Sequence, residues 1–223
     1  MKPFRCLDQA TAPDGTVLSL YEHDGAYVIR AGGVELMSTR RHHSEDRLAE
    51  LVCVPLTTTV GARVLIGGLG LGFTLRAALR SLGDDAGVLV VELVDAVIEW
   101  NRNPAYNLGG AALHDPRVTL QHDDVMNTLA AHPGAFDGIM LDVDNGPDAL
   151  TTADNELLYG EDGIRLTAAA LRPGGRIAYW SADQDPAFAR ALRRAGLTVE
   201  QVSARAHATR STRHAIYVAT RGR

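Results

Sequence analysis

Short apolar runs alternate with turn signals near the start of this chain. The runs lie at Val17–Tyr21, Ala26–Arg30 and Val34–Met37. Asp24-Gly25 separates the first two runs, and Gly32-Gly33 precedes the third. Because Asp-Gly and Gly-Gly between β-rich runs are typical of hairpin turns, this pattern predicts a small antiparallel meander.

The hydrophobic period changes after the meander. Leu48, Leu51 and Val52 share one face of an expected helix that opens at Ser44, and Ser44 is the predicted N-cap. From residue 60 onward, continuous apolar runs alternate with helical patterns. We therefore expect a β-meander domain at residues 1–43 and a larger domain at residues 44–223.

Seven strands are expected in the larger domain. They lie at Arg63–Ile66, Val88–Glu92, Val118–Leu120, Phe136–Leu141, Arg176–Trp180, Leu197–Val202 and His214–Ala219. Helical patterns fill the intervals 73–82, 96–101, 125–131, 156–171 and 186–195. Strand–helix alternation predicts an α/β fold with a Rossmann-like, mostly parallel sheet. No helix separates the last two strands, so that pair should be antiparallel.

Charge narrows the classes of partner. The 223 residues have a formal net charge of −5, yet residues 190–223 hold eight arginines against one acid, Glu200. The rest of the chain is therefore strongly acidic, which argues against non-specific nucleic-acid binding and permits a cationic substrate.

Other features bear on location and oligomeric state. No apolar run is long enough to cross a membrane, and the first residues lack the apolar core of a signal peptide. With only Cys6 and Cys53, neither a cysteine metal site nor a disulfide framework is expected, and a cytoplasmic protein is the default. Exposed strand edges of the meander would suit a homodimer contact.

A glycine-rich loop is the first candidate site. Gly68, Gly70 and Gly72 lie between an expected strand and an expected helix, where glycines let the backbone approach a ligand and the helix N-terminus offers N–H donors. Glu92 ends the next strand, at the position of an acid that accepts hydrogen bonds from ribose hydroxyls. Together they predict an adenosine-containing co-substrate. The G-x-G-x-G spacing departs from the G-x-G-x-x-G of NAD-binding loops.

Acidic residues follow the next two strands. Asp123 and Asp124 could accept a hydrogen bond from an adenine amino group or cap the following helix, and both interpretations stay open. Asp142 and Asp144 follow the fourth strand, where ligands of open α/β sheets bind. Two carboxylates there could hold an amine and take its proton, although an Asp-rich turn around Asn145 would also explain them.

Two further positions carry side chains that could reach a site. His42 and His43 are adjacent, and adjacent side chains on a helix or strand should point apart, so no metal site is expected. His42 could form a polar wall of an acceptor pocket. Trp180 ends the fifth strand, where it could pack in the core or line the pocket.

Taken in order, these motifs resemble the spermidine synthase (polyamine aminopropyltransferase) family over roughly residues 34–185. The segments that carry the resemblance are Val64–Gly68, Val91–Val94, Asp115–Val118, Phe136–Asp142 and Leu171–Gly175. The resemblance implies a class I methyltransferase-like fold behind a small N-terminal β-domain. It also implies decarboxylated S-adenosylmethionine or S-adenosylmethionine as donor and a small amine as acceptor.

The resemblance also implies roles for residues. The glycines and Glu92 would bind the nucleoside, Asp124 matches the family's adenine-binding aspartate, and Asp142 matches the first aspartate of its D-x-x-D motif. Glu45 lies near the family's tyrosine–glutamine–glutamate segment, with His42 beside it. Acceptor-binding positions would thus include His42, Glu45 and Asn145.

Two positions depart from the family pattern. Gly70 stands where the family's loop usually has an aspartate that contacts the donor's aminopropyl amine. Asn145 stands at the second aspartate of D-x-x-D, so Asp144 would have to substitute for it. The leading hypothesis is transfer of an aminopropyl-type group to an amine, with Asp142 and Asp144 as the catalytic carboxylates. The alternatives are an S-adenosylmethionine-dependent methyltransferase and a nucleoside-binding protein without turnover.

Overall fold

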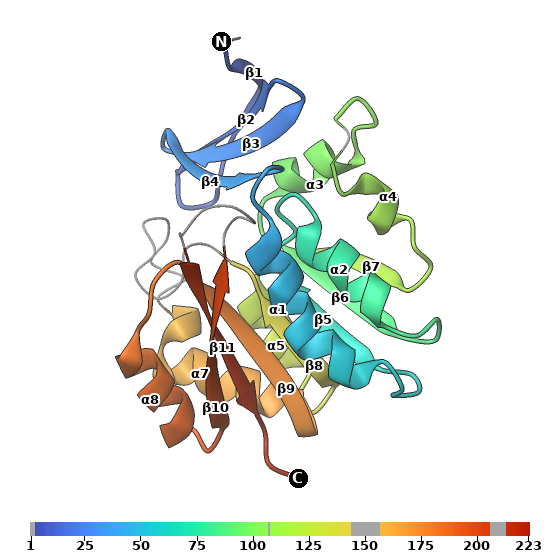
Figure 1. Cartoon of the computed structure of the whole chain (residues 1–223), viewed down its shortest axis with the longest axis vertical. Helices are drawn as coiled ribbons and strands as arrows, with labels where there is room; N and C mark the ends of the chain where they lie inside the picture. The colour runs from blue at the N-terminus through green and yellow to red at the C-terminus, as the bar shows by residue number, and fades with distance from the viewer. Residues whose placement is uncertain (1–2, 107, 144–156, 206–212) are drawn as a thin grey trace.

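Two β-sheets organise the chain in a computed structural model that describes residues 3–106, 108–143, 157–205 and 213–223 (Figure 1). The smaller sheet is antiparallel, in the order β1-β2-β3-β4. Its strands are β1 (Arg5–Thr11), β2 (Val17–His23), β3 (Ala26–Ala31) and β4 (Val34–Ser38). The predicted meander is confirmed, and β1 was missed because its residues are mostly polar and exposed.

The larger sheet has seven strands in the order β10-β11-β9-β8-β5-β6-β7. These are β5 (Arg63–Gly67), β6 (Gly87–Glu92), β7 (Val118–His122), β8 (Phe136–Leu141), β9 (Leu171–Ser181), β10 (Thr198–Arg205) and β11 (Arg213–Thr220). Neighbouring strands among β5 to β9 are parallel, and β11 is antiparallel to both β9 and β10. The predicted fold class and the antiparallel ending are confirmed.

Helices cover both faces of this sheet. They are α1 (His43–Cys53), η1 (Val54–Leu56), α2 (Phe73–Ser81), α3 (Asp95–Arg102), α4 (Gly110–Leu113), α5 (Val125–Ala131), α7 (Glu161–Ala170) and α8 (Pro186–Arg194). One core joins α1, α2 and α3 to the sheet through residues such as Val64 and Ile66, and the other joins α5, α7 and α8 through Leu65. The alternation along β5 therefore sends successive side chains to opposite faces.

The start of α1 differs from the prediction. Its N-cap is His42, which makes no side-chain capping bond, and Ser44 lies inside the first turn as a buried residue. The prediction of Ser44 as N-cap was therefore wrong. The buried hydroxyl of Ser44 instead donates a hydrogen bond to the side chain of Glu45.

The small sheet lies over the end of the large sheet at which β5 leads into the glycine loop and α2 (Figure 1). Residues of the β1–β2 turn and of β4 line a pocket together with residues that follow β5, β6 and β8. The small sheet thereby closes one side of the site. The division into domains 1–43 and 44–223 remains a prediction. Among the described residues, no helix is long and apolar enough to span a membrane.

Candidate active site

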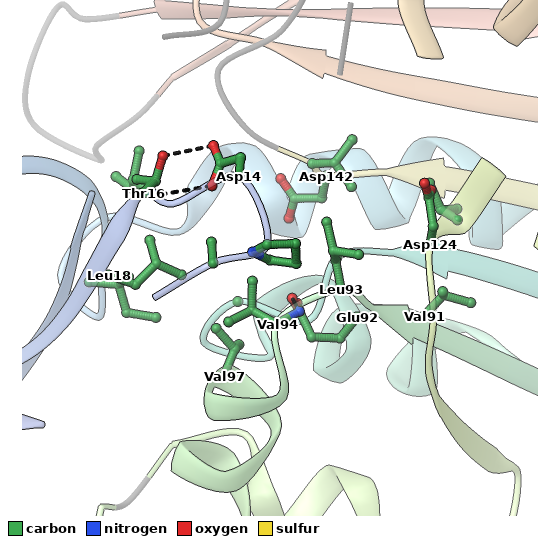
Figure 2. Close-up of a pocket in the computed structure, with 18 of the residues that line it drawn as sticks. Asp14, Thr16, Leu18, Val91, Glu92, Leu93, Val94, Val97, Asp124 and Asp142 are labelled. Carbon is green, nitrogen blue, oxygen red and sulfur yellow. Dashed lines mark hydrogen bonds between the residues drawn. The ribbon is translucent and has the colours of Figure 1, made fainter. Parts of the chain in front are cut away.

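The larger of two adjoining pockets lies at the carboxyl ends of the parallel strands (Figure 2). It contains about 930 Å³ of space, part of it open to solvent. Gly68, Gly70, Glu92, Asp123, Asp124 and Asp142 all line it. The structure thus brings together residues that the sequence assigned to nucleoside binding and one of the two proposed catalytic carboxylates.

Two glycines of the loop lie too close to neighbouring backbone to carry a side chain. Gly68 has φ +89°, and a Cβ on it would lie 2.5 Å from the carbonyl oxygen of Asp142. Gly72, the N-cap of α2, has φ +75°, and a Cβ there would lie 2.8 Å from the Cα of Gly109. Both conformations are left-handed, which favours glycine. These glycines let the loop nest against β8 and the segment before α4.

Glu92 fixes this loop from the end of β6. Its Oε2 accepts a hydrogen bond from the backbone N–H of Leu69, and its Oε1 accepts one from Val94, both at 2.8 Å. The side chain is buried and lines the pocket. Because each carboxylate oxygen has two lone pairs, Glu92 can hold the loop and still accept hydrogen bonds from a ligand's hydroxyls.

Asp124 caps a helix and also borders the pocket. Its Oδ1 caps α5 by accepting from the Met126 N–H at 2.8 Å, and its side chain also borders the pocket. Beside it, hydrogen bonds from the side chain of Asn127 and the backbone of Asp124 lower the pKa of Asp123. The capping prediction is confirmed, and adenine binding stays a prediction.

The turn between β1 and β2 forms a wall that the sequence analysis missed. Both oxygens of Asp14 accept hydrogen bonds from Thr16, one from the backbone N–H at 2.9 Å and one from the hydroxyl at 2.7 Å (Figure 2). Pro13-Asp14-Gly15 is a turn signal, and reading it as one would have predicted β1 as well. Asp14 adds another carboxylate to those already lining the pocket.

A smaller pocket adjoins the first, and the two share Leu36, Met37, Gly70 and Asp142. The smaller one is also lined by Glu45 from α1, Phe73 from α2, Trp180 from β9, and Leu69 and Leu71 of the glycine loop. Trp180 is only 9% exposed, so it packs in the core and lines the pocket at once. The junction of the two pockets is therefore at Gly70 and Asp142.

Two carboxylates face this smaller pocket. Thr74 donates its hydroxyl hydrogen to Asp142 Oδ2 at 2.7 Å, which orients that group from the first turn of α2. Burial and the negative charge of Asp142 raise the pKa of Glu45 from 4.5 to about 7, although a hydrogen bond from Ser44 opposes the rise. Near neutral pH Glu45 can therefore both hold and release a proton.

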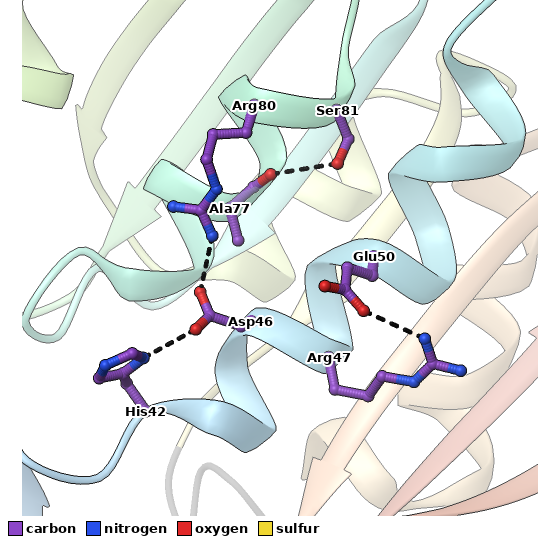
Figure 3. Close-up of polar contacts among 7 residues, drawn as sticks. All are labelled: His42, Asp46, Arg47, Glu50, Ala77, Arg80 and Ser81. Carbon is purple, nitrogen blue, oxygen red and sulfur yellow. Dashed lines mark hydrogen bonds and ion pairs between the residues drawn. The ribbon is translucent and has the colours of Figure 1, made fainter. Parts of the chain in front are cut away.

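A polar network ties α1 to α2 (Figure 3). Asp46 binds the His42 ring at 2.7 Å and Arg80 at 2.9 Å. The His42 ring also stacks on Phe73, with centroids 4.4 Å apart. His42 is not among the residues that line the two described pockets, and its role as a pocket wall is still only a prediction.

Asn101 is a positioning residue that the sequence did not indicate. From α3, its side-chain amide donates to the Gly70 carbonyl at 2.8 Å, and its Oδ1 accepts from the Gly109 N–H at 2.9 Å. The side chain is buried. Asn101 thereby joins the glycine loop to the turn before α4, a contact between segments that no local pattern could reveal.

Some predicted site residues lie outside the described part of the chain. They are Asp144 and Asn145, which follow β8. Within the described ranges, no three His, Cys, Asp or Glu side chains form a group that could hold a metal ion.

Sequence comparison finds relatives among bacterial enzymes. The chain is 34% identical over 134 residues to the polyamine aminopropyltransferase of Mycobacterium tuberculosis, a match that covers 59% of this chain and 25% of that protein. It is 33% identical over 150 residues to the polyamine aminopropyltransferase of Corynebacterium efficiens, covering 66% and 27%. The chain thus spans about a quarter of the length of these relatives. No protein-family model matches it.

Structure comparison finds the same group. A spermidine synthase in complex with the transition state analogue AdoDATO matches with a TM-score of 0.76 and 18% identity, covering 98% of this chain and 73% of that one. Spermidine synthase from Thermotoga maritima matches with the same TM-score and coverage and 19% identity. At these identities the structural likeness establishes the fold. The resemblance predicted from the motifs is confirmed.

Proposed function

Starting from the relationship of this chain to the polyamine aminopropyltransferases, we propose that it transfers an aminopropyl group from decarboxylated S-adenosylmethionine to a small amine. The observation that carries the proposal is the charge of the described pocket lining. In the larger pocket that lining includes five carboxylates and no lysine, arginine or histidine. Such a surface favours a cationic donor and disfavours one that also carries a carboxylate.

The donor would lie along the larger pocket. Glu92 would accept hydrogen bonds from the ribose hydroxyls, and Asp124 would accept one from the adenine amino group. The aminopropyl chain would then reach the junction at Gly70 and Asp142, where the two pockets meet. This arrangement brings the sulfonium carbon next to the acceptor's pocket.

The acceptor would occupy the smaller pocket as a cation. Glu45 and Asp142 supply negative charge, while the rings of Phe73 and Trp180 supply apolar walls that also attract ammonium groups. We assign proton acceptance to Glu45, because burial and the negative charge of Asp142 raise its pKa to about 7, close to the pH at which the amine must lose its proton. Asp142, held by Thr74, would orient the amine.

The transfer is a single displacement. The ammonium gives a proton to Glu45, and the nitrogen lone pair then attacks the aminopropyl carbon that is bonded to the sulfonium sulfur. A carbon–nitrogen bond forms, and the carbon–sulfur pair goes to sulfur. The leaving group is neutral methylthioadenosine. Positioning of the two substrates should supply most of the rate.

The direct test is incubation with decarboxylated S-adenosylmethionine and putrescine, then with a panel of other diamines. Release of methylthioadenosine in equal amount to a new, longer polyamine would support the proposal. Absence of methylthioadenosine with every amine would overturn it. The assay should use all 223 residues of this chain, because both β-sheets contribute residues to the pocket.

A second candidate is an S-adenosylmethionine-dependent methyltransferase. The observation that favours it is Gly70, where the loop carries no carboxylate and the Met37 thioether lies close by. Mass spectrometry of the spent nucleoside distinguishes the two activities. S-adenosylhomocysteine would indicate methyl transfer, and methylthioadenosine would indicate aminopropyl transfer.

A further inference from the structure

We propose that Ser44 and His214 form a proton relay that carries the acceptor's proton from Glu45 to the surface. The proposal rests on the function proposed above and adds two positioning residues to it. Neither residue lines the described pockets, and each acts through Glu45.

The relay is defined by two short contacts between elements far apart in the chain. Ser44 Oγ lies 2.5 Å from Glu45 Oε2, and His214 Nδ1 lies 3.1 Å from the same Ser44 Oγ. Ser44 belongs to α1 and His214 to β11, 170 residues later. The serine is buried at 2% exposure, whereas the histidine is partly exposed. A continuous path thus runs from the pocket carboxylate to a side chain that reaches solvent.

Trp180 fixes the outer end of this path. Its ring meets the His214 ring edge to face, with centroids 4.6 Å apart. The same tryptophan lines the smaller pocket beside Glu45. One side chain therefore forms the acceptor's wall and holds the imidazole in place.

The proton balance is simple. With Glu45 ionised, the Ser44 hydroxyl donates to it. When Glu45 takes the amine's proton, the hydroxyl turns, accepts from Glu45 and donates its own hydrogen to Nδ1 of a neutral His214. Glu45 is then ionised again and His214 is a cation, which releases a proton to solvent. Proton exchange with water then returns the imidazole to the tautomer protonated on Nε2, so that Nδ1 can accept again. Histidine suits this step because it exchanges protons near neutral pH.

The surroundings of Glu45 support its taking a proton from the amine. Asp142 from β8 and Asp46 from α1 both act on Glu45 as negative charges, and burial is the largest cause of its raised pKa. Asp46 is itself paired with Arg80 of α2. The hydrogen bond from Ser44 is the main side-chain contact that lowers the pKa of Glu45.

Four variants test the relay in the full chain: Ser44→Ala, His214→Ala, His214→Gln and, as a control, His114→Ala. His114 is an exposed residue at the end of α4, and it lines neither described pocket. With decarboxylated S-adenosylmethionine and putrescine at pH 7, we expect kcat to fall about 100-fold in the first three, at the low end of proton-transfer effects. Added imidazole should restore His214→Ala but neither His214→Gln nor Ser44→Ala. The control should keep its kcat.

A measurement without turnover separates this proposal from the transfer activity. Carbon-13 NMR of glutamate-labelled protein should show the Glu45 pKa rising in Ser44→Ala, because the lost hydrogen bond stabilised the ionised form. If wild type is active but both His214 variants keep kcat within about twofold between pH 6 and 9, the relay is wrong. If wild type is inactive with every amine, the transfer proposal fails. An unshifted Glu45 pKa in Ser44→Ala would then reject the relay as well.

Discussion

A Cβ placed on Gly70 would lie 2.7 Å from the Sδ of Met37. The glycine belongs to the loop after β5, and the methionine belongs to β4 of the small sheet. Gly70 also has φ +51°, in the left-handed region. The small sheet and the glycine loop therefore meet where the two pockets join, and the glycine is required for both its conformation and its space.

Replacing Gly70 with alanine should cost more stability than a positive φ alone explains. Gly196→Ala is the matched control, because Gly196 has φ +85° and no atom within 4 Å of its Cβ position. We expect Gly196→Ala to lower the free energy of unfolding by about 1 kcal/mol and Gly70→Ala by about 2–3 kcal/mol in urea titrations. Adding Met37→Ala to Gly70→Ala should recover the difference between the two. Equal losses in the two single variants would argue against a steric role for Met37.

Replacing Glu92 with glutamine should weaken nucleoside binding. An amide has only one acceptor oxygen, so it cannot serve Leu69, Val94 and two ribose hydroxyls together. Loss of a hydrogen bond to a charged group costs about 1.5–3 kcal/mol, which corresponds to roughly a 10- to 100-fold rise in Kd. Calorimetry with methylthioadenosine would measure it. Glu99→Gln, an exposed glutamate paired with Arg102, should bind like wild type.

Replacing Asn101 with alanine should weaken the attachment of the glycine loop to the segment before α4. The change leaves the Gly109 N–H without its partner and removes the donor to the Gly70 carbonyl. Leaving buried polar groups unpaired costs about 1–3 kcal/mol each. We therefore expect a loss of a few kcal/mol in unfolding free energy together with weaker methylthioadenosine binding. Asn103→Ala, on a partly exposed residue, should affect binding little. If Asn101→Ala were as stable as wild type, Asn101 would not hold the glycine loop against the turn before α4.

The strands, and the edge of the large sheet at which the site lies, could be predicted because both depend on local sequence patterns. Apolar runs such as Phe136–Leu141 are buried on both faces, and helix α5 was predicted with its observed bounds. Gly68, Glu92 and Asp142 were predicted together because carboxyl ends of parallel strands share one edge.

The remaining parts of the site depend on contacts across the chain. Met37 reaches Gly70, Asn101 reaches the same loop, and His214 reaches Ser44 only after the sheets have packed. Ser44 looked like an N-cap because serine before a helix usually caps it, but burial in the first turn gave its hydroxyl a different partner. Side-chain contacts between distant elements leave no periodic signal in the sequence.

Replacing Asp142 with asparagine should separate transfer from donor binding. The amide keeps the shape and can still accept from Thr74, but it removes a negative charge from the acceptor's pocket. We expect kcat/KM for putrescine to fall about 100-fold, while methylthioadenosine binds within about threefold of wild type. Asp84→Asn, on an exposed loop, is the control and should change neither quantity. Retained activity would remove Asp142 from the acceptor site.

Glu45 should make stability depend on pH in a way that Glu45→Gln abolishes. The folded chain holds a proton on Glu45 up to about pH 7, whereas the unfolded chain releases it near 4.5. Between these values the folded state binds more protons, so its stability falls as pH rises. The contribution of Glu45 is thus fully present below pH 4.5 and lost above pH 7. Its upper limit is about 3 kcal/mol.

The measurement is the free energy of unfolding of wild type and variant at pH 4.5, 6 and 8. Relative to wild type, Glu45→Gln should gain stability steadily over that range, because glutamine has no proton to release. Glu50→Gln, at an exposed position on the same helix, should show no such trend. A constant difference between wild type and Glu45→Gln from pH 4.5 to 8 would mean that Glu45 titrates alike in the folded and unfolded chain. Glu45 would then lack the raised pKa that qualifies it as the base.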